Sequence, residues 1–157
     1  MLKEGDKAPD FQLNGLTPEG EEKVISLNDL LSYGKKLILY FYPKDNTSGW
    51  TVEATDFRDK VNEIKDIAII AGISPDSIKS HKNFREKHNL NFFLLSDPEK
   101  KVMEMYDAYG EKKMYGKVKM GVIRSTYLID KNGIIIKKWR NVKAKGHAEK
   151  VIKELNL

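Results

Sequence analysis

Cysteine is missing from all 157 residues of the sequence. Its absence excludes disulfide bonds, thiolate metal sites and catalysis by a thiol, since each of these needs a cysteine sulfur. Long apolar runs are missing as well, and none approaches the ~20 residues that span a bilayer. The segment from Met1 to Asp10 is charged and lacks the apolar core of a secretory signal. We therefore expect a cytoplasmic protein and no membrane partner.

Charge of neither sign is scarce, because 28 Lys and Arg stand against 23 Asp and Glu, a net charge of +5 at pH 7. Charged residues make up 32% and hydrophobic residues 40%, the balance of one globular domain over residues 1–157. Most basic residues alternate with acidic ones, although the stretches 112–119 and 137–145 are more one-sided. No nucleic-acid-binding motif accompanies them, so we interpret the charge as solvated surface and expect no nucleic-acid partner.

The histidines do not form a metal-binding pattern. His81 and His88 are seven residues apart and lack the i, i+4 spacing of paired zinc ligands. We interpret them and His147 as structural or solvated residues. We expect neither a metal nor a cofactor.

Apolar segments of the chain alternate between strand and helix patterns. Residues 36–42 and 66–74 are apolar runs that predict two buried central strands. Between them, apolar residues recur at three- and four-residue steps from Trp50 to Ile64, which predicts an amphipathic helix. A strand–helix–strand unit of this length implies that the two strands pair in parallel.

The remaining patterns predict a thioredoxin-like α/β fold, with a mixed central sheet flanked by helices and an N-terminal β-hairpin. Asn132-Gly133 favours a hairpin turn between two late strands, and residues 107–119 are predicted to be a loop. We expect helices at about 76–88, 98–106 and from 146 onward, strands at 91–95, 122–129 and 134–139, and the N-terminal hairpin from 11–13 and 23–25.

Residues 42–58 (YPKDNTSGWTVEATDFR) resemble the active-site signature of the peroxiredoxins: proline, three residues, threonine, two residues and cysteine. Pro43 and Thr47 match this signature, and Trp50 stands where the peroxidatic cysteine belongs. The segment is similar to the bacterioferritin comigratory protein (PrxQ) branch, which often has a resolving cysteine where this chain has Thr55. Segments that extend the resemblance over nearly the whole chain are 5–13, 73–76, 96–98 and 124–130.

The resemblance implies thioredoxin-dependent reduction of hydrogen peroxide and alkyl hydroperoxides by a thiolate. A helix N-terminus stabilises such a thiolate, and Arg124 is implied to supply a fixed positive charge beside it. The Thr47 hydroxyl is implied to bond the sulfur and the peroxide, and Pro43 to shield the pocket from water. The loop at 107–119 is implied to lie near this site, while packing of its tyrosines as local core is equally open.

The substitutions remove the chemistry that the resemblance implies. Trp50 has only an N–H donor and cannot act as a nucleophile, so we expect the chain to be inactive as a peroxidase. Its bulk is expected to displace residues 47–55 from a regular helix start. Thr55 could act as a nucleophile only with an activating base beside it, and the sequence shows none nearby.

Three functions therefore remain open. The chain is a peroxiredoxin scaffold whose cysteines were replaced, or a natural cysteine-less relative that acts as a binding or regulatory module, or a basic protein that binds nucleic acid or other anions. The partners that the resemblance implies are a peroxide and a thioredoxin-like reductant. We expect a monomer or a weak homodimer.

Overall fold

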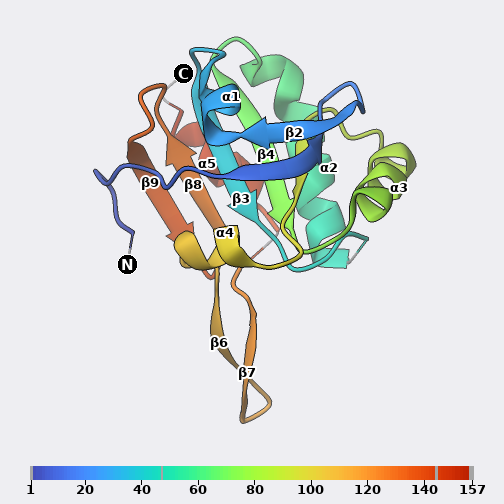
Figure 1. Ribbon diagram of the computed structural model, residues 1–157, viewed down its shortest axis with the longest axis vertical. Coiled ribbons are helices and arrows are strands. Elements are labelled where there is room, and N and C mark those ends of the chain that lie inside the picture. The colour runs from blue at the N-terminus through green and yellow to red at the C-terminus, as the bar shows by residue number, and fades with distance from the viewer. Residues whose placement is uncertain (1, 47, 144, 156–157) are drawn as a thin grey trace.

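The computed structural model describes residues 2–46, 48–143 and 145–155. A seven-stranded mixed sheet forms its centre, in the order β2-β1-β5-β4-β3-β8-β9, and helices cover both faces (Figure 1). The strands are β1 (Gln12–Leu16), β2 (Glu22–Ser26), β3 (Lys36–Phe41), β4 (Ala68–Ser74), β5 (Phe93–Ser96), β6 (Tyr109–Met114), β7 (Lys117–Val122), β8 (Ser125–Ile129) and β9 (Ile135–Arg140). The helices are α1 (Leu27–Leu31), α2 (Ser48–Ile64), α3 (Ile78–His88), α4 (Lys101–Met105) and α5 (His147–Lys153). This is the predicted thioredoxin-like arrangement.

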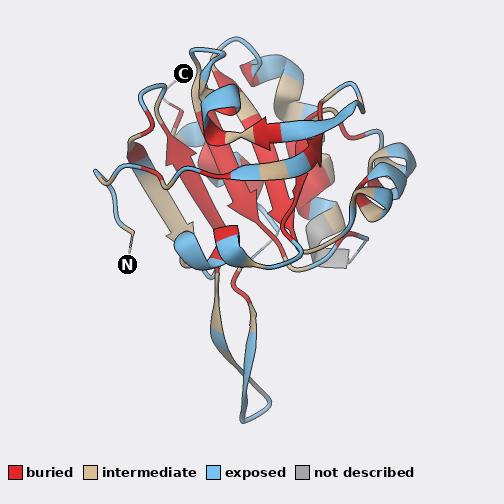
Figure 2. Cartoon of the chain, viewed as in Figure 1, coloured by how far each residue is buried: buried red, intermediate tan, exposed pale blue. Residues whose placement is uncertain are grey.

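The predicted strand–helix–strand unit is confirmed. β3 pairs in parallel with β4, and β4 pairs in parallel with β5. Side chains alternate along β3, so that Leu37, Leu39 and Phe41 enter one core while Ile38 and Tyr40 enter the other. The buried strands at the centre of Figure 2 have apolar layers on both faces, which explains why they read as continuous apolar runs.

The two cores divide the helices between the faces of the sheet. Ala54 and Phe57 of α2 pack in the same cluster as Phe84 of α3 and Val151 of α5. The other cluster contains side chains of α1 and α4, including Leu30. Helix α2 therefore lies on one face of the sheet beside α5. This packing positions α2, whose first turn follows β3. No helix among the described residues is long and apolar enough to span a bilayer.

The predicted turn at Asn132-Gly133 is confirmed. The Asp130 carboxylate accepts hydrogen bonds from the backbone N–H groups of Asn132 and Ile134, both at 2.9 Å. Gly133 has φ +86°, a conformation that glycine adopts without strain. The turn joins β8 to β9, which pair antiparallel. The predicted N-terminal hairpin is also confirmed, because β1 and β2 pair antiparallel.

Residues 107–119 do not form the predicted loop. β6 and β7 pair as an antiparallel hairpin outside the main sheet, and this hairpin projects from the body of the protein (Figure 1). Its two-residue turn is Tyr115-Gly116, with φ of 53° and 76°, instead of the Asn-Gly pair that signals such turns in a sequence. Helix α1 was also missed, because five residues are too few to show a helical period.

Candidate functional site

The site predicted from the sequence lies where β3 ends and α2 begins. Pro43 is half-buried in this connection. Thr47 and the side chain of Trp50 lie outside the described part of the structure. The backbone of α2 is helical from Ser48 to Ile64 without interruption. The expected displacement of the first helical turn is therefore wrong for the backbone from Ser48 onward, and residue 50 stands in the first turn.

Arg124 comes to this connection from the neighbouring strand of the sheet. It directly precedes β8, whose first residue, Ser125, pairs with Phe41 at the end of β3. Its backbone is held by the N–H of Val142, which donates to the Arg124 carbonyl at 3.1 Å. The antiparallel register of β3 and β8 thus places Arg124 beside the end of β3.

A buried glutamate that was not predicted as a site residue lies near Arg124. Glu53 lies one turn into α2 and is only 2% exposed. Burial raises the pKa of Glu53 to about 8, and the Arg124 charge lowers it by less. Burial, followed by the Glu53 charge, raises the pKa of Tyr40 well above its ordinary value, while the Arg124 charge lowers it. These couplings bring Arg124, Glu53 and Tyr40 into one electrostatic cluster.

Two buried polar atoms of Glu53 and Arg124 lack hydrogen-bond partners within the described part of the chain. Among the described residues, neither Glu53 Oε2 nor Arg124 Nη1 has a hydrogen-bond partner, although both atoms are buried. With Glu53 protonated at neutral pH, the guanidinium is the charged member of this pair. Together with the N-terminus of α2, it favours a negative charge at the site. The sequence could have indicated Glu53 as a candidate, because it is a charged residue directly before Ala54 in the apolar stripe of α2.

Thr55 is not placed for nucleophilic chemistry. Its hydroxyl donates to the backbone carbonyls of Thr51 at 2.9 Å and Val52 at 3.1 Å. This bonding to the preceding turn is ordinary for threonine inside a helix. No described basic side chain hydrogen-bonds the Thr55 hydroxyl, so the structure supplies no activating group for it.

A second buried polar group holds the connection between β3 and α2. Asp45 is 3% exposed, and its Oδ2 lies 2.7 Å from His81 Nδ1 on α3. The hydroxyls of Tyr42 and Ser80 donate to the same carboxylate at 2.6 and 2.9 Å. His81 Nε2 lies 2.9 Å from the Leu95 carbonyl, which can only accept. The two ring nitrogens thus face the Leu95 carbonyl and the Asp45 carboxyl, and Asp45 and His81 form a buried hydrogen-bonded pair.

Asp76 continues this network to the sheet. Its Oδ2 accepts from the Asp45 backbone N–H at 2.7 Å and from the Ser74 hydroxyl at 2.8 Å. The connection that carries the peroxiredoxin signature is therefore tied to β4, β5 and α3 at once. His81 was expected to be structural or solvated, and it is structural. Its pairing with Asp45 was not predicted, because the two residues are distant in sequence.

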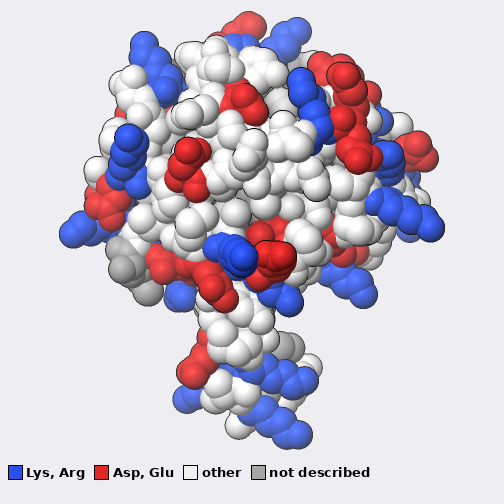
Figure 3. Space-filling view, viewed as in Figure 1, with Lys and Arg blue, Asp and Glu red and all other residues white. Residues whose placement is uncertain are grey.

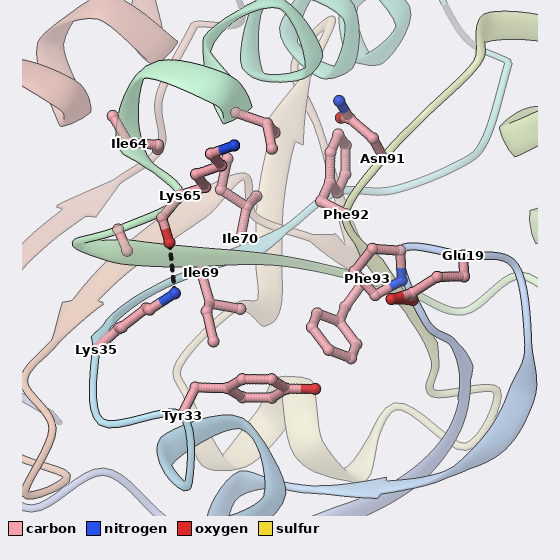
Figure 4. A pocket seen from close by; sticks show the side chains of 13 residues that line it. Glu19, Tyr33, Lys35, Ile64, Lys65, Ile69, Ile70, Asn91, Phe92 and Phe93 are labelled. Carbon is pink, nitrogen blue, oxygen red and sulfur yellow. Dashed lines mark hydrogen bonds between the residues drawn. The ribbon is translucent and has the colours of Figure 1, made fainter.

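A pocket of about 320 Å³ lies away from this site (Figure 4). It is lined at the start of β4 by Ile69 and Ile70, and by Tyr33 and Phe93. Lys35 Nζ closes one side of it by donating to the Lys65 carbonyl at 2.6 Å. Since the signature follows the opposite end of β3, this pocket is separate from the candidate site. Among the described residues, no group of three or more His, Asp or Glu side chains is arranged to hold a metal.

Known proteins share this fold and sequence. Residues 4–138 match the AhpC/TSA family. The chain is 49% identical over 155 residues to a putative peroxiredoxin bcp of Helicobacter pylori strain J99, which covers 98% of each chain. It is 49% identical over 152 residues to peroxiredoxin Bcp of Bacillus subtilis, covering 96% of this chain and 93% of that protein. A solved PrxQ variant from Xylella fastidiosa has a TM-score of 0.87 at 34% identity, covering 99% of this chain and 96% of that one.

The fold and the signature at the end of β3 define a thioredoxin-fold peroxiredoxin. The chain belongs to the AhpC/TSA family, in the Bcp/PrxQ branch of the peroxiredoxins, with both redox cysteine positions substituted.

Proposed function

We propose that this chain keeps the frame of a peroxide-binding pocket but does not reduce peroxides. The observation that carries the proposal is the complete absence of cysteine from a chain whose signature is otherwise intact. Reduction of a peroxide by this family requires a thiolate that attacks one oxygen, becomes a sulfenic acid and releases the other oxygen as water or an alcohol. No side chain at position 50 or 55 can take that role.

The retained residues have the roles that the family resemblance implies. Arg124 supplies the fixed positive charge, Thr47 the hydroxyl, and Pro43 the cover of the pocket. Trp50 occupies the peroxidatic position and Thr55 the resolving position. Burial of Glu53 beside Arg124 supports this assignment, because a protonated carboxyl leaves the guanidinium charge available to a ligand. The chain then acts as a cytoplasmic binding or regulatory module built on a peroxidase scaffold.

Peroxide consumption is the direct test of inactivity. The purified chain should not consume hydrogen peroxide with dithiothreitol or with thioredoxin and its reductase. Turnover above a blank without protein, after removal of contaminating peroxidase, would overturn the proposal.

Restoring the nucleophile tests the retained pocket. In Trp50→Cys, the single thiol should have a pKa below that of a free cysteine, because the helix N-terminus and Arg124 both favour the thiolate. It should react with hydrogen peroxide much faster than free cysteine and stop at the sulfenic acid. Adding Thr55→Cys should give recyclable turnover once α2 unwinds locally, because the two positions lie in one continuous helix.

A matched control separates the pocket from the helix. Val52→Cys places a thiol at an exposed position of the same helix, and it should react like free cysteine. Arg124→Ala in the Trp50→Cys background should slow the peroxide step. If the Trp50→Cys thiol titrates and reacts no differently from the Val52→Cys thiol, the signature is only a scaffold and the site assignment is wrong.

A further inference from the structure

The hairpin of β6 and β7 leaves large apolar side chains in water. Tyr115 at its tip is 98% exposed, and Val118 and Met120 on β7 are 55% and 59% exposed. The hairpin extends away from the body of the protein, and its outer part is coloured as exposed in Figure 2. Exposed apolar side chains that gather within six residues are typical of an interaction site.

The backbone at the tip of the hairpin has a conformation that is unfavourable for a bulky residue. Tyr115 has φ 53° and Gly116 has φ 76°, the pair of left-handed conformations found in a type I′ turn. Asn, Asp and Gly tolerate the first of these positions, whereas a bulky residue there is an outlier. An aromatic side chain kept at a strained and fully exposed position indicates that it has a function.

The same hairpin carries an excess of positive charge. The hairpin contains Lys112, Lys113, Lys117 and Lys119 against Glu111 alone, so it carries +3 of the chain's net charge of +5. Figure 3 shows these basic side chains gathered on the projection. Lys112 and Lys119 are directly opposite each other in the strand register. Like charges at opposite positions destabilise a strand pair, which a negatively charged partner would relieve.

The combination of charge and shape selects among anionic partners. Phosphates of a nucleic acid would pair with the lysines but would leave Val118 and Met120 in water. A protein partner would need a recess shaped to fit a convex tip that is exposed all around. A lipid surface needs no such recess, because lipids rearrange around an inserted tip. We propose that the β6–β7 hairpin docks the protein on membranes that contain anionic lipid.

The hairpin has suitable dimensions and chemistry for this contact. Six-residue strands extend roughly 20 Å, so the tip reaches a surface before the body does. Tyrosine favours the level of the lipid headgroups, and nearby lysines are attracted to anionic lipid. From the sequence alone we expected no membrane partner, because no apolar run approaches the ~20 residues that span a bilayer. The contact is peripheral and is made by the tip of the hairpin, whose base continues into Arg124.

Vesicle sedimentation tests the proposal with the full-length chain. The protein should sediment with vesicles of phosphatidylcholine and phosphatidylglycerol in equal parts, and much less with phosphatidylcholine alone. Because each lysine near an anionic surface strengthens binding about fivefold, Lys117→Glu with Lys119→Glu should lower partitioning by at least roughly 25-fold. The control is Lys79→Glu with Lys87→Glu, which makes the same change in net charge at exposed positions of α3 and should retain most of the binding.

Tyr115→Asn separates binding from folding. Asparagine suits the left-handed position better than tyrosine does, so thermal stability should be unchanged or higher. Loss of the aromatic side chain should nevertheless lower partitioning, on the order of tenfold. Equal binding to both vesicle types, equal loss in the α3 control, or unchanged binding by Tyr115→Asn would overturn the proposal. Binding to duplex DNA through the same lysines, without binding to vesicles, would replace it with a nucleic-acid interface.

Discussion

Glu53→Gln tests whether the buried carboxyl beside Arg124 is protonated at neutral pH. Glutamine keeps the size and hydrogen-bonding shape of a neutral glutamic acid but cannot ionise. The folded-state pKa of Glu53 is raised from 4.5 to about 8, mainly by burial. Between these values the unfolded chain releases the proton while the folded chain retains it. Stability is therefore fully present below pH 4.5 and falls as the pH rises toward 8.

The effect of Glu53 on the free energy of unfolding is measured most directly at pH values where few other groups titrate. His147, whose pKa burial lowers from 6.5 to about 4, changes stability only below pH 6.5. From pH 6.5 to about 8, each pH unit corresponds to about 1.4 kcal/mol. The free energy of unfolding of the original chain should therefore fall by about 2 kcal/mol over this range. In Glu53→Gln that fall should be smaller by about this amount, and the variant should be the more stable protein near pH 8.

Urea unfolding followed by far-ultraviolet circular dichroism at several pH values measures both slopes. Glu63→Gln is a matched control, because it removes an exposed glutamate from the same helix. This control should keep the slope of the original chain. A free energy of unfolding that stays flat or rises from pH 6.5 to about 8 would show that Glu53 is ionised and paired with Arg124. The assignment of Arg124 as the charged member of the pair would then be wrong.

Three further predictions concern other buried groups. As the pH drops from 6.5 to about 4, His147 should lower the stability, because only the unfolded His147 gains a proton readily, and this opposes the gain from Glu53; in the Glu53→Gln background the fall should be visible in urea titrations, and His147→Gln should reduce it. His81→Leu should destabilise the protein by about 1–3 kcal/mol, because it removes a buried hydrogen-bond partner of the Asp45 carboxyl; unchanged stability in urea unfolding would show that this pair does not stabilise the fold. Gly15→Ala should cost about 1–3 kcal/mol in thermal or urea unfolding, since its Cβ would lie 2.4 Å from Leu95 Cδ2 and 2.9 Å from the Leu94 carbonyl oxygen; unchanged stability would show that the strands separate easily there.

The sequence by itself determined the main elements of the fold and the family. β3 and β4 are apolar runs, and α2 has an apolar stripe with helical spacing, so local patterns were sufficient to predict them. The peroxiredoxin signature and the loss of its cysteines are also properties of the sequence. The Asp130–Gly133 turn was predictable because its geometry depends on neighbouring residues.

Only the tertiary structure decided which polar groups meet. Arg124 joins Glu53 because the register of β3 and β8 brings distant segments together. Asp45 pairs with His81 because α3 packs beside the end of β3, and no local pattern reports that contact. The hairpin of β6 and β7 was missed for another reason. Its side chains are largely exposed, so the alternation of buried and exposed residues that marks a strand is absent from its sequence.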